Sequence, residues 1–144
     1  MALQGVANVM VRGLLSTPGI SSGIGKFLIT LYVVGRKSGR HYTIPVAYTQ
    51  HEGALLIGTP FGWAKNLRTG EPLEVKYKGK RRTADVEVFK DEGNVVAIYG
   101  IMCRANRNFA KFNKVRLGED GTPNAEDLRA AWQSGGRAFK LTLR

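Results

Sequence analysis

The segment Leu73–Phe89 constrains the fold more than any other part of the 144-residue chain. It reads LEVKYKGKRRTADVEVF, and apolar and polar residues alternate on both sides of Gly79. Such alternation is typical of strands that bury one face, and a glycine between two such runs is typical of a hairpin. The residues expected on the inner face are Val75, Tyr77, Ala84, Val86 and Val88. The lysines are then expected to point outward.

Four other segments predict strands, and the segments between them predict short helices. The predicted strands are Phe27–Val34, Thr43–Gln50, Ala54–Pro60 and Arg137–Arg144. The predicted helices are Leu3–Leu15, Trp63–Arg68, Asn94 to about Asn113, and Ala125–Trp132. About six strands with short flanking helices predict a mainly β (α+β) fold, a small antiparallel barrel. We expect it to be closed because exposed strand edges promote aggregation.

The chain is expected to form a single domain over residues 1–144, as its length suggests. No apolar run approaches the ~20 residues of a membrane helix, and the N-terminus lacks the charged and long apolar regions of a signal peptide. Cys103 is the only cysteine and there are two histidines, so neither a disulfide framework nor a bound metal is expected. We therefore expect a cytoplasmic protein.

Residues 1–19 predict an amphipathic helix that ends at the sequence Ser-Thr-Pro-Gly. Packing on the domain is one interpretation of this helix. A lid over a binding site, or a segment in peripheral contact with a membrane, is the other.

The formal net charge of +11 calls for an anionic partner or a very soluble surface. Nucleic acid, anionic lipid and an acidic small molecule all fit this charge. Against nucleic acid, the aromatic residues are not interleaved with the cations of Lys76 to Arg82.

The turn between the first two predicted strands, GRKSGR, contains the densest group of cations. Gly35 and Gly39 permit a tight backbone, Ser38 offers a hydroxyl, and the cations are Arg36, Lys37 and Arg40. Backbone amides in such a turn can form an anion-binding nest, and Lys and Arg add charge-assisted bonds to phosphate. The alternative is a hairpin tip with solvated cations.

The junction IGTPFGW, at the end of the predicted strand Ala54–Pro60, suggests a pocket for a flat ring. Gly58 and Gly62 would let a ring approach the backbone, and Phe61 and Trp63 would stack on it or wall its pocket. The alternative is that both aromatic residues belong to the core.

Few side chains suit acid–base or nucleophilic catalysis. His41 and His51 lie in or beside turns, and Asp85 and Glu87 suit a solvated strand face. Cys103 lies beside Arg104, which could lower its pKa, although a buried helix cysteine is the alternative. If the protein is an enzyme, a cofactor is expected to carry the reaction.

Residues Val33 to Phe89 resemble the deazaflavin-dependent nitroreductase family of actinobacteria. The resemblance consists of the GRKSG turn, a proline in the next strand, a strand that ends in small residues, a tryptophan, and the segment NLRTGEP before a hairpin. It implies a split β-barrel that binds the deazaflavin coenzyme F420 and acts as an oxidoreductase.

The resemblance also implies roles for individual residues. The family turn that grips the phosphate of the coenzyme tail corresponds to Arg36, Lys37 and Ser38, with Gly35 and Gly39 keeping its shape. The strand end whose backbone lies along the ring corresponds to Gly58, Thr59, Pro60 and Phe61, followed by Trp63 and Asn66. Tyr42 stands where many relatives have arginine, and the loop from Pro60 to Trp63 is shorter than in many relatives.

The expected function is hydride transfer from reduced F420 to an electrophilic small molecule such as an unsaturated lactone or enone, a quinone or a nitroaromatic. Tyr48, Tyr99 or solvent could donate a proton, and the sequence does not rank them. An FMN-binding protein like the pyridoxamine-phosphate oxidases is the second hypothesis, and a basic nucleic-acid-binding module is the third. Monomer and homodimer both stay open.

Overall fold

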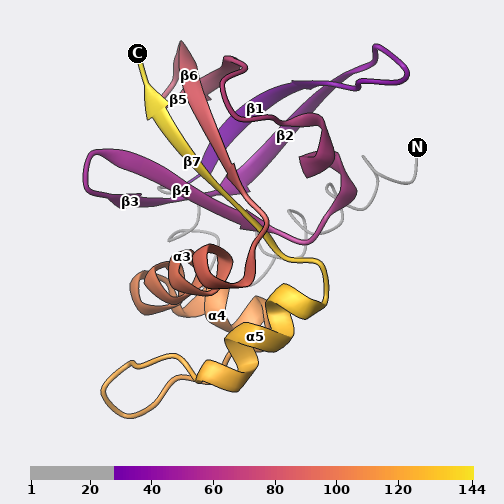
Figure 1. Cartoon of the computed structure of the whole chain (residues 1–144). Coiled ribbons are helices and arrows are strands. Elements are labelled where there is room, and N and C mark those ends of the chain that lie inside the picture. The colour runs from indigo at the N-terminus through magenta and orange to yellow at the C-terminus, as the bar shows by residue number, and fades with distance from the viewer. Residues whose placement is uncertain (1–27) are drawn as a thin grey trace.

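The structure is a computed structural model that describes residues 28–144, so the predicted N-terminal helix and its lid role lie outside the described part. In this described part, seven strands form a single antiparallel sheet with three α-helices beside it (Figure 1). The strands are β1 (Leu28–Val34), β2 (His41–Ala47), β3 (Thr49–His51), β4 (Ala54–Thr59), β5 (Leu73–Tyr77), β6 (Lys80–Phe89) and β7 (Arg137–Leu143). A short 3-10 helix, η2 (Gly62–Asn66), follows β4.

The order of the strands in the sheet, β2-β1-β5-β6-β7-β4-β3, explains its curvature. The two edge strands, β2 and β3, are consecutive in sequence, and Tyr48 alone separates them. Because one residue spans only about 3.3–3.6 Å, the two edges must come close together. The sheet therefore curls into a barrel that is left unpaired between β2 and β3. This confirms the expected split β-barrel architecture, but the expectation that the barrel is closed was wrong.

The sequence predicts six strands, and residues 28–144 form seven. The predicted strand Thr43–Gln50 is divided at Tyr48 into the end of β2 and the first two residues of β3. The Leu73–Phe89 hairpin is confirmed, with Lys78 and Gly79 as its two-residue loop at φ values of 49° and 79°. Positive φ at both loop positions matches the primed turns that suit the twist of a hairpin.

The inner face of the sheet forms the main hydrophobic core. Of the inner-face residues predicted in the hairpin, Val75, Ala84 and Val86 are buried in this core, and Tyr77 and Val88 pack against it. Phe139 and Leu141 of β7 enter the same core. The alternation in the sequence thus assigned the inner face of the hairpin correctly.

The helices after β6 form a second layer (Figure 1), and they are α3 (Glu92–Ala105), α4 (Arg107–Phe112) and α5 (Ala125–Gln133). The single helix predicted up to Asn113 is two helices, because the Asn106 side chain accepts hydrogen bonds from the amides of Asn108 and Phe109 and so begins α4. No helix among residues 28–144 is long and apolar enough to cross a membrane.

The helical layer packs on β4 and β7 around Tyr99. Gly58 of β4 pairs with Ala138 of β7, so two small residues lie side by side on the sheet. A Cβ atom built on Gly58 would lie 2.6 Å from Tyr99 Cε1 and 2.9 Å from Phe109 Cζ. Glycine is therefore required here for the close approach of the chain's own aromatic rings.

We expect Gly58→Ala to lower the free energy of unfolding by about 1–3 kcal/mol, the usual cost of overpacking a core. Gly100→Ala in α3 is the matched control, because its Cβ would meet Leu128 Cδ1 at an ordinary 3.7 Å. That change should raise stability by about 0.5–1 kcal/mol, since glycine disfavours a helix interior. Urea denaturation measures both, and equal effects of the two changes would contradict the packing interpretation.

Candidate functional site

The cationic turn between β1 and β2 is held by its own backbone. The Gly35 amide donates to the Arg40 carbonyl at 2.7 Å, and the Gly39 amide donates to the Gly35 carbonyl at 2.9 Å. Gly39 has φ +70°, a conformation that favours glycine. Ser38 Oγ accepts from the Arg40 amide at 3.2 Å and leaves no room for a Cβ on Gly35. Both glycines are therefore needed for the shape of this turn.

Two amides of the turn, those of Lys37 and Ser38, donate to no acceptor within residues 28–144. The Lys37 ammonium is exposed and has no ion-pair partner in the same range. These groups could bind an anion. The nest is smaller than the sequence suggested, because the Gly35, Arg36, Gly39 and Arg40 amides already have acceptors.

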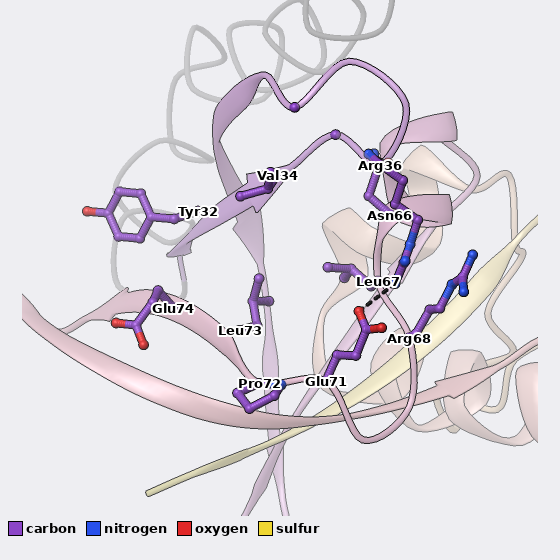
Figure 2. A pocket seen from close by; sticks show the side chains of 12 residues that line it. Tyr32, Val34, Arg36, Asn66, Leu67, Arg68, Glu71, Pro72, Leu73 and Glu74 are labelled. Carbon is purple, nitrogen blue, oxygen red and sulfur yellow. Dashed lines mark hydrogen bonds and ion pairs between the residues drawn. The ribbon is translucent and has the colours of Figure 1, made fainter.

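The turn docks onto the segment that follows β4. The Arg36 amide donates to Asn66 Oδ1 at 3.0 Å, and Asn66 Nδ2 donates to the Trp63 carbonyl at 3.0 Å. The Arg36 guanidinium forms an ion pair with Glu71 at 2.5 Å (Figure 2). Two segments about 30 residues apart, both singled out in the sequence, thus meet at one place.

A groove of about 540 Å³ lies beside this junction (Figure 2). It runs along β1 and the start of β5, and one of its walls carries the Arg36–Glu71 ion pair. The residues that line it are Tyr32, Val34, Gly35, Arg36, Gly39, Asn66, Leu67, Arg68, Glu71, Pro72, Leu73 and Glu74. Sequence reasoning missed Tyr32, Arg68, Glu71 and Glu74; only the NLRTGEP motif drew attention to this segment.

The strand end differs from the predicted ring pocket. The space beside Gly58 is filled by Tyr99 and Phe109, so the flat rings that approach this glycine belong to the protein itself. Thr59 is buried, and its Oγ1 accepts from the Phe61 amide at 3.1 Å. Pro60 is exposed and Phe61 is half-buried. Gly58, Gly62 and Asn66 are also partly exposed, whereas Thr59 and Trp63 are buried.

Trp63 is fully buried in the barrel core, where it stacks on Phe139 with ring centroids 6.4 Å apart. This position matches the alternative in which Trp63 is a core residue, and its indole presents no surface to a ligand. The indole N–H has no hydrogen-bond partner among the described residues. Contact with a bound ring would require this side chain to leave the core.

The two candidate proton donors, Tyr48 and Tyr99, lie in different parts of the molecule. Tyr99 is fully buried between α3 and the sheet, and its hydroxyl donates to the Arg137 carbonyl at 3.4 Å. Burial raises its pKa well above the ordinary value. Tyr48 packs edge-on against Tyr77 at 5.5 Å, and burial together with the neighbouring Tyr77 raises its pKa to about 12. Both hydroxyls are protonated at neutral pH.

Other candidate groups from the sequence have structural positions in the protein. Cys103 is fully buried, and this burial raises its pKa to about 12, which matches the inert helix cysteine. Asp85 forms an ion pair with Arg144 at 2.7 Å. No group of three or more potential metal ligands occurs among residues 28–144.

Two cations of the β5–β6 hairpin lie over tyrosine rings. Arg81 stands 4.3 Å from the centroid of the Tyr32 ring, and Lys78 stands 5.3 Å from that of Tyr77. The sequence predicts that the aromatic residues are not interleaved with the cations of Lys76 to Arg82. In space this expectation was wrong, because the register brings Tyr32 of β1 next to β5 and within reach of β6.

Comparison with known proteins gives no family assignment. No protein-family model matches the chain, and no curated protein matches it in sequence. A crystal structure of the conserved hypothetical protein Rv2991 from Mycobacterium tuberculosis is 12% identical, with a TM-score of 0.48, covering 89% of this chain and 81% of that one. A candidate 5-nitroimidazole antibiotic resistance protein from Bacteroides thetaiotaomicron is 10% identical, with a TM-score of 0.46, covering 89% and 80%. At these values no activity follows from the likeness.

The place of Trp63 in the core can be tested with two substitutions. Trp63→Ala should lower the free energy of unfolding by about 3–5 kcal/mol, the usual cost of truncating a buried tryptophan. Trp63→Phe should cost much less, because phenylalanine keeps most of the buried aromatic volume and removes a donor whose lack of a partner costs about 1–3 kcal/mol. Denaturant unfolding of both variants measures the difference, and similar losses would contradict the core position of this side chain.

The buried thiol predicts a loss of stability at alkaline pH. The pKa of Cys103 is about 12 in the folded protein against an ordinary 9.0. The contribution of the neutral thiol to the free energy of unfolding is therefore complete below pH 9 and is lost as the pH rises toward 12. Cys103→Ala should reduce the alkaline slope by about 1.4 kcal/mol per pH unit. Unfolding curves at a series of alkaline pH values measure this slope. The same slope in the variant would mean that the thiol does not contribute.

Proposed function

We propose that this protein is an oxidoreductase that binds coenzyme F420 at the β1–β2 turn. It would pass a hydride from the reduced coenzyme to an electrophilic small molecule such as an unsaturated lactone or enone, a quinone or a nitroaromatic. The supporting observation is the hydrogen bond from the Arg36 amide to Asn66 Oδ1, which joins the two segments that carry the family resemblance. This contact brings both segments to one surface, where a single ligand would touch both.

The turn has the groups that a phosphate requires. The amides of Lys37 and Ser38, which have no acceptor among residues 28–144, lie with the Ser38 hydroxyl and the Lys37 ammonium on two consecutive residues between the two glycines. Charge-assisted hydrogen bonds from such groups are the strong ones in phosphate recognition. The phosphate of the F420 tail would therefore bind here, with Gly35, Gly39 and Arg40 shaping the turn.

Fewer described residues are available to contact the ring of the coenzyme than its phosphate. Gly58 and Trp63 are occupied by internal packing, so the exposed Pro60 and the half-buried Phe61 are the described residues able to flank a ring at the strand end. F420 supplies the hydride when it is bound, and the protein orients it and excludes water. Tyr99 is fully buried and Tyr48 is only 5% exposed, so solvent is the proton donor that we retain.

The proposal is tested by titrating the purified protein with oxidised F420 and with FMN side by side. Both ligands carry a phosphate that the turn could hold, so FMN is the second candidate. Saturable binding of F420 without binding of FMN supports the proposal. Preferential binding of FMN would move the protein to flavin chemistry, and binding of neither ligand would refute both assignments.

Lys37→Ala should weaken F420 binding by about 1.5–3 kcal/mol, the range for hydrogen bonds to charged groups. The loss should shrink at high salt, because exposed charges are screened. The matched control is Lys78→Gln with Lys80→Gln in the β5–β6 hairpin, which should change the affinity by less than about 0.5 kcal/mol. A tenfold loss in the control would place the coenzyme tail across the hairpin instead.

A further inference from the structure

We propose that Glu71 is the resident anion of the β1–β2 turn and competes with the ligand phosphate for the Arg36 guanidinium. This inference rests on the proposed function in one respect only, the identity of the ligand. It assigns to Glu71 a role in setting the affinity and the specificity of the site. No such role was expected from the sequence, in which the turn was counted as fully cationic.

The geometry places the Glu71 carboxylate where an anionic ligand would bind. Its Oε2 contacts the Arg36 guanidinium at 2.5 Å, and both side chains line the 540 Å³ groove. The Arg36 side chain keeps 29% of its surface accessible and the Glu71 side chain 57%. Another anion can therefore reach Arg36, and Glu71 can swing into solvent, without any change in the fold.

The carboxylate is not needed to hold its own segment in place. The Gly70 amide donates to the Val86 carbonyl at 3.1 Å, and the Glu71 amide donates to the Arg68 carbonyl at 3.1 Å. The Val88 amide donates to Thr69 Oγ1 at 3.0 Å. Since these bonds use backbone groups and Thr69, the segment stays attached to β6 when the Glu71 carboxylate is removed.

The turn is also held without the carboxylate. The Arg36 amide is bonded to Asn66, and the Gly35 and Gly39 amides are bonded within the turn. The Glu71 carboxylate therefore affects ligand binding by neutralising part of the positive charge of Arg36. A ligand must displace it, which favours a phosphate group over a single carboxylate because the oxygens of a phosphate can accept bonds from Arg36, Lys37 and the turn amides together.

The test compares Glu71→Gln with Glu74→Gln in the same groove. Glu74 is the matched control, because it lines the groove but is bound to Thr83 at 2.6 Å and to Arg81 at 3.6 Å. The probes are inorganic pyrophosphate and oxidised F420, measured by calorimetric titration at low salt. Glu71→Gln should bind both roughly threefold to tenfold more tightly, whereas Glu74→Gln should gain less than about twofold, since exposed ion pairs act mainly at contact distance.

Arg36→Gln completes a double-mutant cycle. If Glu71 acts through Arg36, then Glu71→Gln should give no gain in the Arg36→Gln background. Equal gains in Glu71→Gln and Glu74→Gln would overturn the inference in favour of a general charge effect. It would also be overturned by an unchanged affinity in Glu71→Gln, by loss of the folded state in that variant, or by no pyrophosphate binding in any variant.

The two probes separate this inference from the proposed function. If Glu71→Gln tightens pyrophosphate binding while neither protein binds F420, the competition by Glu71 stands and the F420 assignment fails. If the unmodified protein binds F420 and Glu71→Gln brings no gain with either probe, the function stands and the inference fails.

Discussion

A single residue, Tyr48, joins the two edge strands of the sheet, and the rest of the architecture depends on that short connection. β2 and β3 lie at opposite ends of the strand order, yet they are consecutive in the chain. A flat sheet of seven strands would separate its edges by about 28 Å at 4.7 Å per strand step. The connection therefore requires the sheet to curl, and the curled sheet encloses the barrel core.

The strands β4 and β7 contribute residues to both hydrophobic cores, the one inside the barrel and the one beneath the helices. On their inner face Phe139 packs with Trp63 in the barrel core, and on their outer face Gly58 and Ala138 receive Tyr99 from α3. Alternation along a strand sends neighbouring side chains to opposite faces, so adjacent residues of β7 belong to different cores. This rigid pair of strands fixes where the chain leaves β4 toward η2.

The exit from β4 brings η2 beside the β1–β2 turn and produces the candidate site. Asn66 links the two backbones, and Glu71 partly neutralises the cations of the turn. The site therefore combines an exposed Lys37 with an Arg36 that already has an anionic partner. A net charge of +11 describes the whole chain, but the local balance at this groove is set by such pairs.

The sequence by itself determined the antiparallel strands, the hairpin loop at Gly79 and the inner-face residues, because these follow from local alternation and turn chemistry. It also identified the GRKSG turn, since dense cations beside two glycines are a local pattern. Tertiary structure alone decided that Tyr48 divides a strand, that Trp63 lies in the core, and that the ring beside Gly58 is Tyr99. It also decided that Glu71 reaches Arg36, because contacts between residues far apart in the chain depend on register and packing that no local pattern contains.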